Sequence, residues 1–368
     1  MIQLKDLCQK ASSNIAQKDL EGHEGQYPIY GASGLIGYVD FYKQENPYVA
    51  VVKDGAGIGR VMCLPEKSSV IGTMQYILPN EGVNVHYLAF AMEHMNLAKY
   101  FSGATIPHIY FKDYGKEKLL ERTEKEQKSI AEILNKMDSL ISLRKQQIAK
   151  LDELVKARFV EMFGDLVAPQ CEYPELKLVD ICADADDIKC GPFGTQLNKD
   201  EYKAKGVAIW EVPQINSGFS EMPTHFITEE KAAILNAYSI EPGDIAMSRK
   251  GNVGKCGLFP ENLKKGIIHS DVLRIRVDKR KVDSCFMMYQ LHFSEAVKRQ
   301  IEMVSSGAIM AGINVTKLKQ IKVRIPELEN QRMFAAFVER VDQQKQTVQQ
   351  SLEKLELMKK ALMQEYFG

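Results

Sequence analysis

The stretch QKSIAEILNKMDSLISLRKQQIAKLDELVKARFVEMFG, residues 127–164, returns in diverged form as QRMFAAFVERVDQQKQTVQQSLEKLELMKKALMQEYFG, residues 331–368. The offset is a constant 204 residues, there is no gap, and eleven of the 38 aligned positions are identical. A repeat of this length indicates duplication. The identical residues of the first copy are Gln127, Ala131, Asp138, Gln146, Lys150, Leu151, Lys156, Ala157, Glu161, Phe163 and Gly164.

Both copies place apolar residues three and four positions apart, as one face of an α-helix does, and no proline interrupts them. Each copy therefore predicts a helix of about 40 residues, about 60 Å long. Each apolar stripe needs a partner of equal length, and only the other copy supplies one. We predict that the helices pair antiparallel, about a pseudo-twofold axis, as a coiled coil. The stripes turn polar at 144–147 and 342–345, which predicts a bend or a break that sets register.

The rest of the chain has short β-rich runs separated by glycines, such as YVAVV at 48–52 and VLRIRV at 272–277. These parts are related to each other, because IGRVMCLP at 58–65 aligns with VGKCGLFP at 253–260. We predict an α+β fold with two β-rich or mixed domains, 1–122 and 165–326. They alternate with the two long helices, 123–164 and 327–368.

Composition limits the classes of protein to consider. The chain has 368 residues, and 48 Lys and Arg balance 48 Asp and Glu. Seven cysteines without a Cys-x-x-Cys pair fit neither a disulfide framework nor a zinc ribbon, so we expect a reduced, cytoplasmic location. No apolar run approaches the length of a membrane helix, and we expect no membrane contact.

Basic residues are concentrated between Arg249 and Lys281, a stretch that contains ten basic and three acidic residues. We expect this local excess to meet phosphates. Two related domains joined by a pair of long helices would have approximate twofold symmetry. A DNA duplex has the same kind of symmetry, because twofold axes relate its two strands. The arrangement predicts that each domain reads half of a split DNA site while helix length sets the gap. The alternative is a coiled-coil scaffold that presents two protein-binding domains.

Several motifs then carry a specific resemblance. They are YPIYGASG at 27–34, GYVD at 37–40, GPFG at 191–194, GDI at 243–245, IKVRIP at 321–326 and the Phe-Gly endings at 163–164 and 367–368. With its alternating order of parts, essentially the whole chain resembles the specificity subunit of type I restriction-modification systems. One departure is that LLERT at 119–123, without proline, leads into the first helix.

The resemblance implies two target recognition domains that bind double-stranded DNA and a subunit that performs no chemistry. It implies docking of two methyltransferase (modification) subunits and, through them, of restriction (nuclease and translocase) subunits. No cofactor is expected in this chain, whereas S-adenosylmethionine is expected in the partner methyltransferases. Neither a methyltransferase signature nor a phosphate loop is found in the sequence.

The glycine-rich stretch DGAGIGR at 54–60 has three interpretations: a tight turn, a nucleotide site, or a backbone approach to DNA phosphate. Its alternating glycines lack the spacing of the dinucleotide fingerprint. We favour the DNA interpretation as the functional one, because KGNVGK at 250–255 repeats glycine and cation at the aligned place.

Polar and basic side chains near these loops are the candidates for DNA contact, although single surface side chains of these types are more often solvated than in contact with a base. In the first domain they are Lys53, Arg60, Gln75, Thr105 and His108; in the second, Thr195, Gln196, Arg249, Lys250, Asn252, Lys255, His269 and Ser270. His108 and His269 lack partners at metal-ligand spacing, so we expect no metal. Trp210, in an apolar run, is expected in the core.

Overall fold

The computed structural model describes residues 1–103, 107–164, 166, 171–305 and 312–368. The chain divides into two compact units. Unit 1 comprises Met1–Ile148 and Thr347–Gly368, and unit 2 comprises Ala149–Gln346. Two long helices, α4 (Glu124–Phe163) and α10 (Leu328–Phe367), each contribute one part to each unit.

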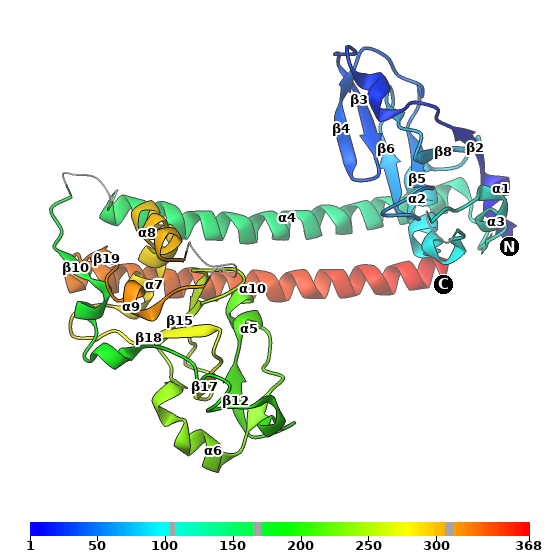
Figure 1. Ribbon diagram of the computed structural model, residues 1–368. Coiled ribbons are helices and arrows are strands. Elements are labelled where there is room, and N and C mark those ends of the chain that lie inside the picture. The colour runs from blue at the N-terminus through cyan, green and yellow to red at the C-terminus, as the bar shows by residue number, and fades with distance from the viewer. Residues whose placement is uncertain (104–106, 165, 167–170, 306–311) are drawn as a thin grey trace. The chain divides into compact units, whose positions relative to one another are not determined.

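Unit 1 contains two main sheets and a short strand pair (Figure 1). The four-stranded sheet has the order β2 (Cys8–Ser12), β8 (Met74–Pro79), β5 (Tyr48–Val52), β6 (Val61–Leu64), and all its pairs are antiparallel. The second has the order β4 (Gly34–Val39), β3 (Tyr27–Gly31), β7 (Ser69–Val70), with β3 and β7 parallel. β1 (Ile2–Gln3) pairs with β9 (Lys118–Leu119), and the short helices are α1 (Leu4–Leu7), α2 (Val85–His94) and α3 (Phe111–Tyr114).

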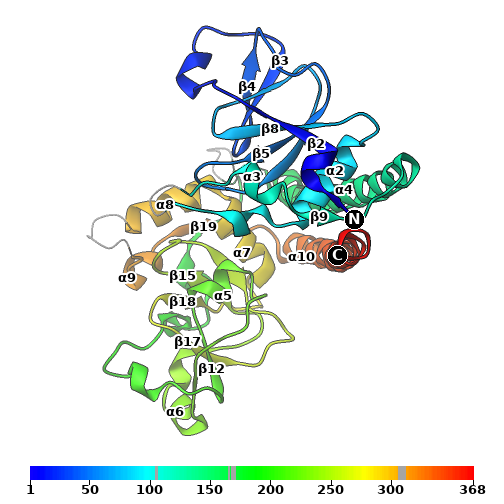
Figure 2. The same cartoon turned by 90° about the vertical axis from the view of Figure 1, so that its right-hand side faces the viewer.

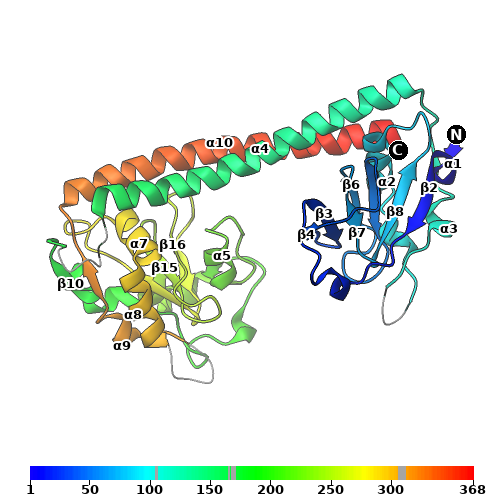
Figure 3. The ribbon, with the colours of Figure 1, turned by 90° about the horizontal axis from the view of Figure 1, so that it is seen from above.

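The central strand β5 explains the layering of unit 1. All five of its residues are buried, and alternate side chains point to opposite faces. Val49 and Val51 pack with α2 and the long helices, whereas Tyr48, Ala50 and Val52 pack toward the second sheet. Figure 3 shows α2 between the four-stranded sheet and the end of α10.

Unit 2 repeats this plan (Figure 2). Its first sheet has the order β11 (Ile188–Cys190), β18 (Val272–Ile275), β15 (Ile245–Ser248), β16 (Cys256–Leu258), and its second β13 (Phe226–Ile227), β12 (Val207–Trp210), β17 (Gly266–Ile268), β14 (Ser239–Ile240). As in unit 1, the second sheet contains a parallel pair, β12 with β17. β10 (Glu175–Lys177) pairs with β19 (Lys322–Arg324), and the short helices are α5 (Val212–Asn216), α6 (Glu229–Ile234), α7 (Ser284–Phe293), α8 (Glu295–Ser305) and α9 (Val315–Leu318).

The two long helices pack against each other within each unit. In unit 1, Lys359 lies 2.7 Å from Asp138, and the Arg144 Nε donates to the Ser351 hydroxyl at 3.2 Å. Residue numbers rise along α4 as they fall along α10, so the helices are antiparallel. The polar stretch near residue 144 supplies this cross-helix contact, and α4 is assigned as one continuous helix through it.

In unit 2 the same pairing is aromatic. The rings of Phe159 and Phe163 lie 5.4 and 5.6 Å from that of Phe334, all three nearly fully buried. Lys345 and Asp152 form an ion pair across the helices at 2.6 Å. The predicted α+β fold, with two related domains alternating with two long antiparallel helices, is confirmed.

Candidate nucleic-acid interface

The glycine-rich stretch of unit 1 is the turn that joins β5 to β6. The Gly59 amide donates to the Val52 carbonyl at 2.8 Å, and the Val52 amide donates to the Arg60 carbonyl at 2.9 Å. Gly55, Gly57 and Gly59 have φ angles of 79°, 83° and 82°, in the left-handed region that glycine adopts readily. The stretch is therefore a tight turn, one of its three interpretations.

Unit 2 builds the same turn between β15 and β16. The Gly254 amide donates to the Ser248 carbonyl at 3.0 Å, and the Ser248 amide donates to the Lys255 carbonyl at 2.8 Å. Both loops thus close with the same two hydrogen bonds and end on a cation.

These terminal cations also have equivalent contacts. Arg60 Nη1 donates to the Ala32 carbonyl at 2.6 Å, and Lys255 Nζ donates to the Asn216 carbonyl at 2.7 Å. Ala32 lies just after β3, the first strand along the chain in the second sheet of unit 1. Asn216 is the last residue of α5, which follows β12, the first strand along the chain in the second sheet of unit 2. A guanidinium carries five N–H donors and an ammonium three, so each cation keeps donors for another group.

The other candidates of unit 1 lie at the base of the turn. Lys53 forms an ion pair with Asp54 at 3.3 Å, and His108 pairs with the same carboxylate. The backbone of His108 exchanges two hydrogen bonds with Ser102. The negative charge of Asp54 therefore offsets the positive charge of Lys53 and of His108 when His108 is protonated. Thr105 lies outside the described residues.

Gln75 is placed differently from the prediction. It lies within β8, is 7% exposed, and its Oε1 accepts a hydrogen bond from the Tyr114 hydroxyl at 2.9 Å. The predicted base contact is at odds with this interior position. The signal that could have shown it is the place of Gln75 inside the mainly apolar run MQYIL at 74–78, whose first four residues are all buried.

Arg249 joins three segments of unit 2. Its Nε donates to the Ile313 carbonyl at 3.1 Å, and its Nη1 donates to the Ser270 carbonyl at 3.3 Å. Its guanidinium lies over the Phe193 ring, 5.3 Å from the centroid. The side chain therefore positions the surrounding loops.

Neighbouring candidates gather at this end of the first sheet. Lys250 pairs with Asp271 at 3.0 Å, and the Asp271 amide donates to His269 Nδ1 at 3.2 Å. Gln196 Oε1 accepts from the Tyr238 hydroxyl at 3.0 Å. The structure thus brings Arg249, Lys250, His269 and Ser270 together. Thr195 and Asn252 are exposed.

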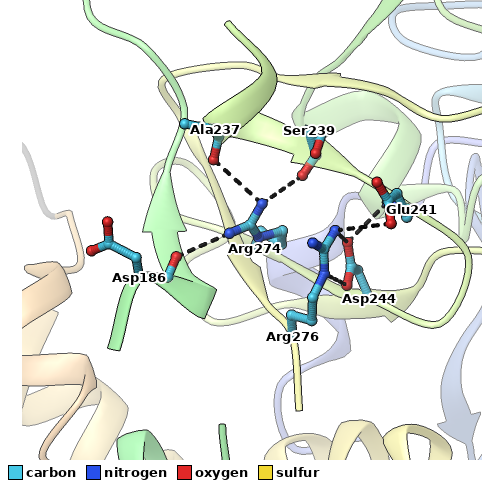
Figure 4. Close-up of polar contacts among 7 residues, drawn as sticks. All are labelled: Asp186, Ala237, Ser239, Glu241, Asp244, Arg274 and Arg276. Carbon is cyan, nitrogen blue, oxygen red and sulfur yellow. Dashed lines mark hydrogen bonds and ion pairs between the residues drawn. The ribbon is translucent and has the colours of Figure 1, made fainter. Parts of the chain in front are cut away.

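Part of the basic excess of 249–281 is internal, so the expectation that it meets phosphates is wrong for Arg274 and Arg276. Arg274 is 5% exposed; its Nη1 donates to the Ser239 carbonyl at 2.8 Å and the Ala237 carbonyl at 3.4 Å, and its Nη2 to the Asp186 carbonyl at 2.9 Å (Figure 4). Burial lowers its pKa. The sequence could not show this, because the acceptors come from distant segments.

Arg276 is likewise engaged inside unit 2 (Figure 4). Its Nε and Nη2 donate to the two oxygens of Asp244, each at 2.7 Å, and Glu241 lies 3.6 Å away. A bidentate arginine–carboxylate pair of this kind is a strong, directional contact. The guanidinium is committed to the protein.

The structure also bears on metals, thiols and membranes. Within the described ranges, no group of three or more His, Cys, Asp or Glu could hold a metal ion. The buried thiols are not poised as nucleophiles, because burial raises the pKa of Cys8, Cys182 and Cys256 to about 12. Among the described helices, none combines the length and apolar character needed to cross a bilayer.

Trp210 is 2% exposed, so its predicted core position is confirmed.

Comparisons with known proteins agree on one family. The family model described as "Type I restriction modification DNA specificity domain" matches residues 1–153 and 187–357. Two proteins of Methanocaldococcus jannaschii, the type I restriction enzyme MjaVIII specificity subunit and the putative type I restriction enzyme MjaX specificity subunit, are each 24% identical over 98% of this chain. The matches cover 89% and 91% of those proteins.

Solved structures show the same fold. The S subunit of a type I restriction-modification system from M. genitalium aligns over 100% of this chain and 95% of its own, with a TM-score of 0.65 and 17% identity. Because the family model covers most of the sequence, the chain belongs to the type I restriction-modification DNA specificity family, whose members are non-catalytic specificity subunits.

Proposed function

We propose that the chain recognises a bipartite site in double-stranded DNA, each domain contacting one half. The observation that carries this proposal is the repeated loop. The β5–β6 and β15–β16 turns close with the same hydrogen bonds and each ends in a cation, Arg60 or Lys255, with donors to spare. Basic donors on such loops suit phosphate oxygens, and contacts to phosphate orient a protein on DNA.

The same proposal includes the partners. The chain docks two methyltransferase subunits, which carry S-adenosylmethionine, and through them restriction subunits. The internal repeat supports a pair of identical partners, because a duplicated chain offers equivalent surfaces twice. A solved relative is described as part of the "complex assembly" of a type I system; it aligns over 99% of this chain with a TM-score of 0.56 and 13% identity.

An exchange of domains tests the proposal. The chain is co-expressed with the methyltransferase of its own locus, and methylated positions are mapped by long-read sequencing. We expect a split motif. Replacing residues 165–326 with the matching domain of another family member should change one half of that motif and leave the other half intact.

Two outcomes would contradict the proposal. A protein-binding scaffold would assemble with partners but show no preference among duplexes. A motif that changes in both halves, or in neither, when one domain is exchanged would show that the domains do not read separate half-sites.

A further inference from the structure

A hollow of about 350 Å3 lies in unit 2 between the β15–β16 loop and helices α7 and α8. The loop supplies Asn252 and Lys255 to its wall, α7 supplies His292 and α8 supplies Lys298. The β15–β16 loop and the consecutive helices α7 and α8, which are distant from that loop in sequence, therefore converge with polar side chains on one small volume.

The loop is held close to α8 by a glycine. A Cβ added at Gly254, which has a φ of 83°, would lie 2.9 Å from Ile301 Cγ2 on α8. A larger residue would push the loop away from the helix. Glycine thus keeps Lys255 beside the hollow.

The hollow is lined by more basic than acidic side chains, Lys255 and Lys298 against Glu302. The pKa of His292 is lowered by burial and then by Lys298, Lys255 and Lys156, which come from α8, the loop and α4. Lys298 is also paired with Glu295 at 2.9 Å, which offsets part of its charge. Three ammonium groups acting on one imidazole create a place where an anion is stabilised.

We propose that the hollow formed by Asn252, Lys255, His292 and Lys298 is a binding site for a phosphate group, which in the complex belongs to the DNA backbone. The assignment to DNA rests on the proposed function. Lysine, histidine and asparagine side chains all donate to phosphate oxygens, and such contacts fix the register of a protein on the duplex. His292 and Lys298 are contacts that no motif in the sequence indicates.

The first test uses inorganic phosphate and the full chain. The imidazole resonances of His292, assigned by loss of signal in His292→Gln, are followed by NMR during titration with phosphate and with chloride at equal ionic strength. Phosphate should shift the His292 signals and raise its pKa toward about 6.5, the ordinary histidine value; chloride should not. Equal responses to both salts would overturn the proposal.

The second test measures DNA affinity against salt for the full chain assembled with its methyltransferase subunits. Lys298→Gln should weaken binding to all duplexes alike and reduce the slope of log affinity against log salt by about 0.9. Lys298→Arg should restore the slope. Lys264→Gln, which removes an exposed lysine outside the hollow, is the matched control and should change the slope less.

The two tests separate this inference from the proposed function. If phosphate shifts His292 but Lys298→Gln behaves like Lys264→Gln, the hollow binds phosphate that is not part of DNA, and the DNA assignment is overturned. If the assembled wild type shows no split motif, the proposed function fails. The titration with inorganic phosphate still decides the anion site in that case.

Discussion

Gln127 and Gln331 occupy the same position at the start of the two long helices. Gln331 is fully buried; its Oε1 accepts from the Asp283 amide at 2.9 Å and its Nε2 donates to the Pro326 carbonyl at 2.7 Å. Gln127 makes the matching contacts with the Asn84 amide and the Arg122 carbonyl. Each amide thus anchors the N-cap of a shorter helix to the long one.

Gln331→Ala should therefore destabilise unit 2. It leaves a part-buried amide and a buried carbonyl without partners, at about 1–3 kcal/mol each, so we expect a loss of about 2–6 kcal/mol in denaturant unfolding followed by unit 2 signals. Gln344→Ala is the control, because Gln344 lies exposed on the same helix and within unit 2. Equal losses in the two variants would contradict the anchoring role.

If the hollow binds a DNA phosphate, His292 should make DNA affinity depend on pH. Its pKa is lowered in the free chain, so the ring is neutral at pH 7, while a bound phosphate favours the protonated ring. Binding then takes up a proton, and affinity should rise as pH falls below about 6.5. The charged groups that face the ring are Lys156 on α4, Lys255 on the loop, and Lys298 and Glu302 on α8.

The check compares DNA affinity at pH 7.5 and 5.5 for wild type and His292→Gln at constant salt. DNA is the right probe because its phosphodiester does not titrate there, unlike inorganic phosphate. Wild type should gain more affinity on acidification than the variant. An identical gain in both would show that another group is responsible.

At the scale of elements, Arg274 links the two sheets of unit 2. It extends from β18 in the first sheet to the carbonyl of Ser239 in β14 of the second, and to Asp186 just before β11 (Figure 4). Arg274→Met keeps much of the apolar stem but removes all of these donors. We expect a loss of about 3 kcal/mol, from carbonyls left unsatisfied. Arg280→Met, at an 85% exposed side chain, should cost far less in the same unfolding experiment.

The long helices were predictable because the spacing of apolar residues, three and four positions apart, is visible in the sequence of each helix without knowledge of the helix that packs against it. Ile130, Leu134, Phe159, Phe334 and Val338 are all buried as that spacing predicts. The edges of the stripe were less predictable. Ile133, Leu154 and Met358 are 40%, 47% and 54% exposed, because the partner helix covers only a narrow seam.

The charged groups show where sequence reasoning ends. Arg249 and Arg274 read as surface cations, yet each is held by backbone carbonyls from segments far along the chain. Every residue has a backbone carbonyl, so residue type does not show which carbonyls will accept hydrogen bonds from a given arginine. The glycine-rich turns were predictable because only glycine suits their positive φ angles.

At the scale of the whole molecule, the two halves share individual hydrogen bonds as well as the order of their elements. The Leu4 amide donates to the Glu117 carbonyl at 2.9 Å, as the Leu178 amide donates to the Ile321 carbonyl at 2.7 Å. The thiols of Cys8 and Cys182 donate to the carbonyls of Leu4 and Leu178, four residues earlier in each copy. Contacts that survive this much sequence divergence identify the frame on which different recognition loops can be exchanged.

If the paired helices set the gap between half-sites, lengthening both should lengthen the gap. Seven residues inserted after Ile148 and seven after Gln346, the boundary between the units, add about 10 Å at 1.5 Å per residue. Seven residues are close to two turns, so the apolar seam stays in register. At 3.4 Å per base pair, methylation mapping should show about three more base pairs between two unchanged half-sites. Insertion into one helix only breaks the pairing and should abolish methylation, whereas an unchanged gap with both insertions would show that the helices do not set it.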